Sequence, residues 1–97
     1  MIRHTVAFKL KHPKGSPQEK AFIEDAKVLA AIPGVARFEQ LRQTSPKNEF
    51  DFGFSMEFAD SEGYAAYNDH PGHVAFVRDR WVPEVAAFME TDYEPLV

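Results

Sequence analysis

The sequence predicts an α+β domain of the ferredoxin-like β-α-β-β-α-β kind, a four-stranded antiparallel sheet with helices on one face. Three observations predict it. Residues 2–11 and 50–58 alternate between apolar and polar side chains, as half-buried strands do. Residues 16–32 and 61–85 carry apolar side chains at helical spacing and lie between strand segments. No repeat, low-complexity tract or linker interrupts the chain, so we expect a single domain over residues 1–97.

The first strand and the first helix have the clearest patterns. One face of the strand over residues 2–11 consists of Ile2, His4, Val6, Phe8 and Leu10. Ser16, Pro17 and Glu19 supply an N-cap hydroxyl, an N1 proline and a capping-box carboxylate, so a helix begins there. Its apolar stripe consists of Phe22, Ala26, Leu29 and Ala30. The helix ends at the Ile32-Pro33-Gly34 segment, because Pro33 disfavours a helical residue before it and Gly34 tolerates left-handed geometry.

Two further strands are expected on either side of a turn at residues 45–49. Residues 35–44 alternate irregularly, which is typical of an edge or interface strand. Residues 50–58 place five large apolar side chains on one face, which predicts the central core strand. These side chains are Phe50, Phe52, Phe54, Met56 and Phe58.

The last third of the chain predicts two helices and a strand. Asp60 or Ser61 can cap a first helix, which must end before Pro71 because proline disfavours a helical residue preceding it. Pro71 fits the first turn of the second helix, and a break or kink is expected at Pro83, which lacks an amide donor. A final strand is expected near Phe88–Glu94.

The face of this sheet without helices would display small or polar groups, which could meet water or a second copy of the sheet. They are Arg3, Thr5, Ala7, Gly53, Ser55 and Glu57. Dimerisation does not follow from this face alone.

Composition excludes several classes of protein. The 97 residues include 15 acidic and 11 basic side chains, for a net charge of −4, and the basic ones do not cluster, which argues against a nucleic-acid partner. The absence of cysteine removes disulfides, thiol nucleophiles and thiolate metal sites, and suits a cytoplasmic protein. We see neither a targeting segment at the start nor an apolar run long enough to span a membrane.

Known catalytic motifs are also missing. The chain has no HExxH segment, glycine-rich phosphate loop, nucleophile elbow or EF-hand loop. Metalloprotease, nucleotide-hydrolase, serine-hydrolase and calcium-sensor functions therefore have no support in the sequence.

Three histidines and a tyrosine are the candidates for chemistry. His4 shares the apolar face of the first strand and would point under the helices, although a hydrogen-bonded core histidine is the commoner role for such a residue. His70, just before Pro71, is expected to cap or brace the turn. His73 lies in the first turn of a helix, where the helix dipole lowers the pKa of an imidazole and favours the neutral form that a general base requires. Tyr67 can donate to a developing oxyanion.

The structural alternative is that these aromatic side chains only fill the core, which is the usual role for such a stripe. It consists of Tyr64, Tyr67, Phe76 and Trp81.

Several segments together resemble the stress-responsive A/B barrel (Dabb) family. They are His4 on the first strand, Ile32-Pro33-Gly34-Val35, Phe58-Ala59-Asp60-Ser61, His70-Pro71-Gly72-His73-Val74-Ala75-Phe76 and Asp92-Tyr93-Glu94-Pro95. The His-Pro-x-His-Val segment is the most specific of them, and the resemblance covers nearly the whole chain. It implies a dimeric α+β barrel in which the sheets of two subunits pack together.

The resemblance also implies a pocket between the sheet and the helices. One member of the family is a plant polyketide cyclase that makes olivetolic acid by an intramolecular aldol condensation without a cofactor, using a histidine and a tyrosine. On matching positions, His73 would be the general base, Tyr67 the donor to the carbonyl oxygen and His4 a residue that orients substrate or base. The pocket would be lined by Phe52, Phe54, Phe76 and Trp81, with Phe52 where the cyclase has a further histidine.

Some family members hold a divalent cation with backbone carbonyls at the helix-to-strand junction. The corresponding residues here are Leu29, Ile32 and Val35, and no side-chain metal site is expected.

Three functions stay open at this point. The first is a cofactor-independent lyase, cyclase or isomerase acting on a small, largely apolar carbonyl compound. The second is a non-catalytic homodimer that binds a small apolar molecule or whose pocket is filled by its own aromatic side chains. The third is an oxygenase, either cofactor-free or with haem held by one of the four histidines.

Overall fold

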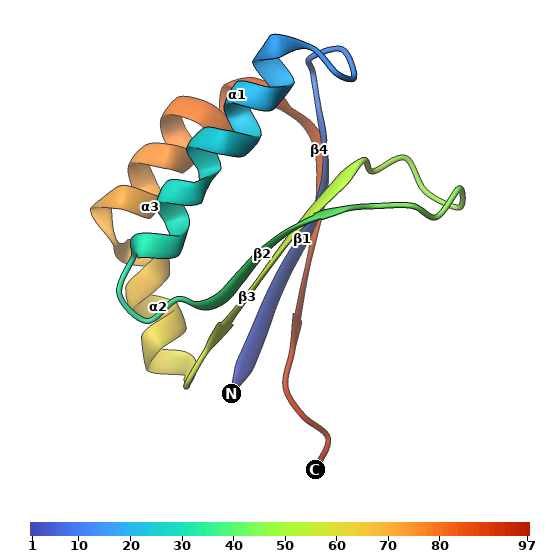
Figure 1. The fold of residues 1–97 in the computed structure, drawn as a ribbon. Coiled ribbons are helices and arrows are strands. Elements are labelled where there is room, and N and C mark those ends of the chain that lie inside the picture. The colour runs from blue at the N-terminus through green and yellow to red at the C-terminus, as the bar shows by residue number, and fades with distance from the viewer.

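The computed structural model describes residues 1–97, and its elements follow one another in the predicted order (Figure 1). They are β1 (Ile2–Leu10), α1 (Pro17–Asp25), η1 (Ala26–Ala31), β2 (Ala36–Arg42), β3 (Phe52–Phe58), α2 (Ser61–Asp69), α3 (Pro71–Phe76), η2 (Val77–Trp81), α4 (Val82–Glu84) and β4 (Val85–Tyr93). The strands pair antiparallel in the order β2-β3-β1-β4, and all the helices cover one face of the sheet (Figure 1). This is the predicted ferredoxin-like topology.

Helix α1 begins where the sequence predicts. The Ser16 hydroxyl accepts a hydrogen bond from the Glu19 amide at 3.2 Å. The Glu19 carboxylate accepts one from the Gly15 amide at 3.1 Å, one residue before the amide that a capping box normally uses. Two amides at this helix end are thereby satisfied without water.

The helix then tightens into the 3₁₀ helix η1, which has three residues per turn. This spacing places Ala26, Leu29 and Ile32 on one buried face. Ala30 is exposed, so its predicted place in the apolar stripe was wrong, because that prediction assumed α-helical spacing throughout. Gly34 ends the segment with φ of +91°, the left-handed geometry expected of it.

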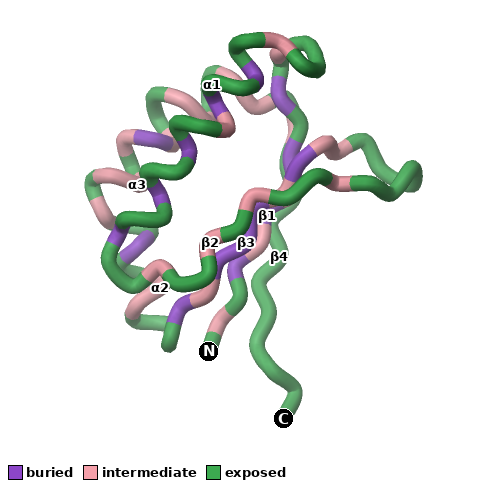
Figure 2. Tube along the Cα trace, viewed as in Figure 1, coloured by how far each residue is buried: buried purple, intermediate pink, exposed green.

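The core lies between the sheet and the helices (Figure 2). Strand β3 contributes four buried apolar side chains, which confirms its central place, whereas Phe50 precedes the strand and is only half-buried. The buried cluster consists of Val6, Phe8, Leu10, Phe22, Ala26, Leu29, Ile32, Phe52, Phe54, Met56, Phe58, Tyr67 and Phe76.

Strand β2 is the edge strand that its irregular pattern predicts. Its pairing with β3 shifts register between Ala36 and Glu39. Within this bulge Arg37 has φ of +52°, which is uncommon for a residue with a side chain. Successive side chains of β2 therefore do not alternate strictly between the two faces of the sheet.

The helices of the second half depart from the prediction around Pro83, and Val85, predicted to be helical, begins β4. Asp60, and not Ser61, caps α2, through a 2.8 Å hydrogen bond from the Gly63 amide. After α3 the chain forms the π-helix η2 and continues through Pro83 to Glu84. The irregularity thus lies one turn before Pro83, where the Val82 amide bonds the carbonyl of Val77.

A charged network fixes the end of this helical segment to the rest of the fold. The Glu84 carboxylate accepts from His12 Nε2 at 2.7 Å and from Arg80 Nε at 2.6 Å. Arg80 also pairs with Asp25 on α1. Burial opposes ionisation of Glu84, but the hydrogen bonds from Arg80 and His12 outweigh it and lower the pKa of Glu84.

The helix-free face of the sheet is as predicted along its centre, where Arg3, Thr5 and Ala7 pair with Glu57, Ser55 and Gly53. The outer strands add large apolar side chains that the sequence reading missed. Leu41, Met89 and Tyr93 lie on this face and are each about half exposed. None of the helices has the length and apolar character needed to cross a membrane.

Candidate functional site

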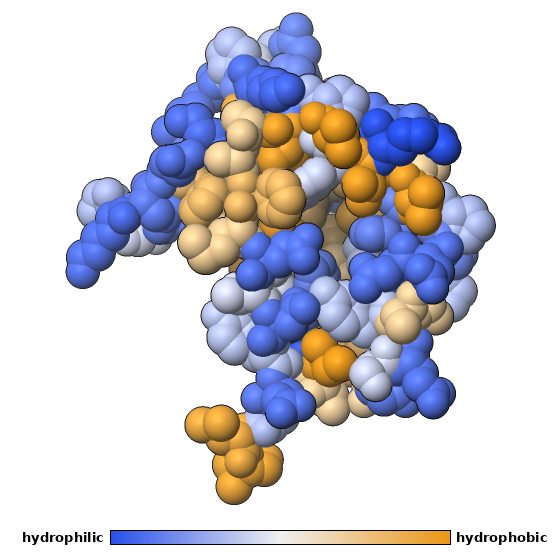
Figure 3. All heavy atoms as spheres, turned by 180° about the vertical axis from the view of Figure 1, so that it is seen from behind, coloured by the Kyte–Doolittle hydropathy of each residue, from blue (hydrophilic) through white to orange (hydrophobic).

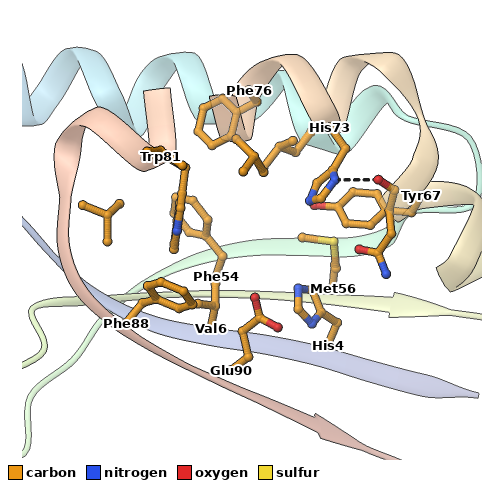
Figure 4. Close-up of a pocket in the computed structure, with 15 residues that line it drawn as sticks. His4, Val6, Phe54, Met56, Tyr67, His73, Phe76, Trp81, Phe88 and Glu90 are labelled. Atoms are coloured by element: carbon orange, nitrogen blue, oxygen red, sulfur yellow. Dashed lines mark hydrogen bonds between the residues drawn. The ribbon is translucent and has the colours of Figure 1, made fainter. Parts of the chain in front are cut away.

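A cavity of about 440 Å³ lies between the sheet and the helices, and eleven of its fifteen lining residues are hydrophobic. Seen from behind, apolar side chains gather around the upper part of a hollow, and hydrophilic ones lie below it (Figure 3). The cavity has two ends (Figure 4). Trp81 and Phe88 lie at the apolar end, and His4, Tyr67 and His73 lie at the polar end.

All three candidate catalytic residues line this cavity, and so do three of the four predicted pocket residues, Phe54, Phe76 and Trp81. Phe52 does not. It lies at the other end of β3 and borders a separate polar hollow beside α1 and β2. Its predicted pocket role is therefore corrected, since alternation along a strand gives the face of a residue but not its position along the cavity.

His73 presents one unpaired nitrogen. Its Nδ1 lies 3.1 Å from the carbonyl oxygen of Asn68, and because a carbonyl only accepts, Nδ1 carries the hydrogen. Nε2 then holds a lone pair and has no hydrogen bond within the chain. Burial lowers the pKa of His73, as does nearby His4, while the Asn68 carbonyl and Glu90 partly offset this. The direction agrees with the prediction, but the main cause is burial and not the helix dipole.

Tyr67 presents an unpaired phenol. The residue is 2% exposed, and its hydroxyl makes no hydrogen bond within the chain. Burial raises the pKa of Tyr67, and the negative charge of Glu90 adds to the effect. The phenol therefore keeps its proton at neutral pH and can donate it in a hydrogen bond. Its ring centroid lies 4.4 Å from that of His73.

Asp92 and Tyr64 fix the His4 ring on the side away from the cavity, a role that the sequence did not predict. Its Nδ1 lies 2.6 Å from Asp92 Oδ1, and the Tyr64 hydroxyl donates to Asp92 Oδ2 at 2.9 Å. Because a carboxylate only accepts, Nδ1 carries a hydrogen, and Nε2 is left without a partner in the chain. Burial and the contact with Asp92 raise the pKa of Tyr64.

The three side chains converge without bonding to one another. The ring centroids of His4 and Tyr67 are 6.3 Å apart, and no hydrogen bond joins any two of the three residues. No fully buried side-chain nitrogen or oxygen lacks a partner, so the unpaired atoms of His4, Tyr67 and His73 border accessible space. That space is the cavity. It therefore offers two imidazole nitrogens and one phenol to a ligand.

His70 and Pro71 lie outside the cavity. The Nδ1 of His70 accepts a 3.0 Å hydrogen bond from the Gly72 amide and caps α3, whose first residue is Pro71. This segment thus fixes where His73 enters the cavity wall.

The structure shows no group of three histidine, aspartate or glutamate side chains placed to hold a metal ion. At the helix-to-strand junction, the carbonyls of Leu29 and Ile32 accept backbone hydrogen bonds from Ile32 and Val35, each at 3.2 Å. A cation bound by the carbonyls of this turn stays a prediction.

Comparison with known proteins decides the family. The family model of the stress responsive A/B barrel domain, Dabb, matches residues 2–95. The chain belongs to the Dabb family. A Dabb protein with a ferredoxin-like fold from Mesorhizobium loti is 66% identical, over 99% of this chain and 97% of that chain, with a TM-score of 0.98.

More distant structures share the Dabb fold. A dimeric ferredoxin-like protein of unknown function from Thermobifida fusca is 25% identical, over 97% of this chain and 90% of that chain, with a TM-score of 0.77. A hydroxynitrile lyase from Passiflora edulis is 14% identical, over 99% of this chain and 94% of that chain, with a TM-score of 0.83. At 14% identity, the likeness to the hydroxynitrile lyase shows a shared fold and nothing more. A search of curated proteins found no match.

Proposed function

We propose that this Dabb protein is a cofactor-independent lyase, cyclase or isomerase that acts on a small, largely apolar carbonyl compound by acid-base chemistry. One observation carries the proposal: three unpaired polar atoms, from His4, Tyr67 and His73, border one end of an apolar cavity. A carbonyl compound whose apolar part lies at the other end would meet all three.

In the proposed step, His73 Nε2 removes a proton from the carbon next to the carbonyl. The C–H bond breaks, its electron pair moves to the carbonyl oxygen, and the Tyr67 hydroxyl donates to the resulting enolate oxygen. The proton stays on His73 until it returns to carbon or to a leaving group. A general base of this kind contributes about 10² to 10⁴ in rate.

His4 acts in the same scheme as an orienting donor or acceptor through Nε2. Asp92 and Tyr64 hold its ring, so its free nitrogen has a fixed direction toward the cavity. The hydroxynitrile lyase with the same fold supports the proposal only to the extent that the fold accommodates a lyase.

The test is exchange of α-protons of an aryl ketone such as acetophenone with deuterium from D₂O, followed by proton NMR. We expect the wild-type protein to accelerate exchange and His73→Ala to lose at least a factor of 10² while keeping its circular dichroism spectrum. His70→Asn is the matched control, because asparagine can also cap a helix and His70 lies outside the cavity. Undiminished exchange by His73→Ala would remove His73 from the mechanism.

The alternative is a non-catalytic protein that stores or carries a small apolar molecule. The apolar lining of the cavity suits this function equally well. A wild-type protein that binds aryl ketones tightly but leaves their α-protons unexchanged would favour it.

We propose further that the protein is a homodimer joined through the helix-free face. Half-exposed Leu41, Met89 and Tyr93 lie on this face, and related structures are described as dimeric. Light scattering after size exclusion should give twice the mass of one chain, and Met89→Lys should reduce it to one. A wild-type monomer at micromolar concentration would refute the dimer.

A further inference from the structure

Glu90 is a charged residue in the wall of the cavity that the proposed mechanism does not use. It lies on β4 opposite Val6, two residues after Phe88 and two before Asp92, so all three β4 side chains face the helices. Its carboxylate is directed into the cavity between Phe88 and His4 (Figure 4). It therefore stands between the apolar end and the polar end.

This carboxylate has no counterion. No lysine or arginine lines the cavity, and the Glu90 side chain makes no hydrogen bond or ion pair within the chain. The arginines of η2 pair with other carboxylates. Arg80 pairs with Glu84 and Asp25, and Arg78 pairs with Asp79. Glu90 is exposed to solvent in the free protein.

The charge of Glu90 reaches the groups that would hold a ligand. It contributes to the raised pKa of Tyr67 and partly offsets the lowered pKa of His73. A second negative charge brought in by a ligand would meet Glu90 without a compensating cation and would lose hydration as the apolar walls enclose it. A ligand hydroxyl at the same place would donate to the carboxylate instead.

The geometry points to Glu90 as the residue that selects the substrate: the cavity takes an uncharged carbonyl compound with a hydroxyl on the carbon next to the carbonyl, and it excludes the corresponding carboxylate. This inference rests on the proposed function, because the position of the hydroxyl follows from placing the carbonyl between His73 and Tyr67. With the carbonyl there and the apolar group near Trp81, we infer that the adjacent carbon comes within reach of Glu90, which lies between the two ends of the cavity.

Binding of three matched phenyl ketones tests the inference without requiring turnover. Acetophenone carries a methyl group next to its carbonyl, α-hydroxyacetophenone a hydroxymethyl group and phenylglyoxylate a carboxylate. Trp81 is the single tryptophan of the chain and lines the cavity, so quenching of its fluorescence reports occupancy. We expect the wild-type protein to bind α-hydroxyacetophenone most tightly and at least tenfold more tightly than phenylglyoxylate, about 1.4 kcal/mol.

Glu90→Gln keeps the size of the side chain and removes its charge. We expect the preference over phenylglyoxylate to fall to within about threefold, mainly because the anion binds more tightly. Glu94→Gln is the control, since Glu94 is exposed, lies outside the cavity and removes the same charge from the protein. The control should keep the wild-type preference.

Three results would overturn the inference: a wild-type protein that does not discriminate, a preference that survives Glu90→Gln, or binding of none of the three ketones to either protein. The proposed chemistry fails on different evidence, namely undiminished proton exchange by His73→Ala. Proton exchange tests His73 and ketone binding tests Glu90, so the two failures are distinguishable.

Discussion

Replacing Asp92 by asparagine would measure how much the hydrogen bond between Asp92 and His4 Nδ1 contributes to the stability of the fold. Asp92 accepts from His4 Nδ1 at 2.6 Å and from Tyr64 at 2.9 Å. Asparagine has nearly the same shape but no charge and only one acceptor oxygen, so the bond from His4 becomes a neutral one and the amide Nδ2 cannot accept from Tyr64. Hydrogen bonds to a charged group contribute about 1.5–3 kcal/mol and neutral ones about 0.5–1.5 kcal/mol, a difference of about 1 kcal/mol for the bond to His4.

Solvent limits this loss, because the Asp92 side chain is 39% exposed while that of His4 is 9% exposed. We therefore expect Asp92→Asn to lower the free energy of unfolding by about 1 kcal/mol, which corresponds to about 4–8 °C in Tm for a domain of this size. Urea unfolding followed by circular dichroism at pH 7 measures it, at one fixed protein concentration because the proposed dimer would make stability depend on concentration.

Glu94→Gln again serves as the control for the change in net charge. A loss for Asp92→Asn no greater than that of the control would refute the reasoning, since the contact with His4 would then contribute nothing beyond a solvated surface pair. Nitrogen NMR of the His4 ring should also show the hydrogen on Nδ1 in the wild-type protein. Its presence on Nε2 instead would contradict the assigned tautomer.

Two further predictions concern His73 and the start of α2. The neutral form of His73 is the base, and its pKa is lowered from 6.5, so the decline of kcat/KM for α-proton exchange as pH falls should be centred below pH 6.5. A decline centred at or above pH 6.5 would contradict the burial of His73. Asp60→Ala removes the cap of α2 and should cost about 1 kcal/mol of stability in urea unfolding. Ser61→Ala should cost no more than a few tenths, and the reverse order would show that the wrong residue is assigned as the cap.

The fold could be predicted from sequence because its signals are local. Alternation over residues 2–10 gives the face of every side chain of β1, and Ser16 with Pro17 marks the start of a helix. Ala30 shows the limit of such reasoning. Its exposure follows from a change of helical pitch at Ala26, which depends on how the chain packs and not on any nearby residue pattern.

The candidate site was predictable in part for the same reason. The faces of His4 and His73 follow from strand and helix periodicity, and both residues line the cavity. The contact between His4 and Asp92 joins residues 88 positions apart and depends on the register of β1 against β4, which no local pattern fixes. Glu90 was not singled out, although its alternation with Phe88 and Asp92 would have placed it on the helical face.

Strand β4 belongs to two surfaces at once. Phe88 and Glu90 line the cavity, Asp92 on the same face holds His4, and the residues between them, Met89 and Thr91, face the opposite side of the sheet. Because one backbone carries both sets, a partner that bends or shifts this strand also changes the distance between Glu90 and the groups across from it. Ligand binding in the cavity and dimerisation through the helix-free face would then be coupled, and each should strengthen or weaken the other by the same factor.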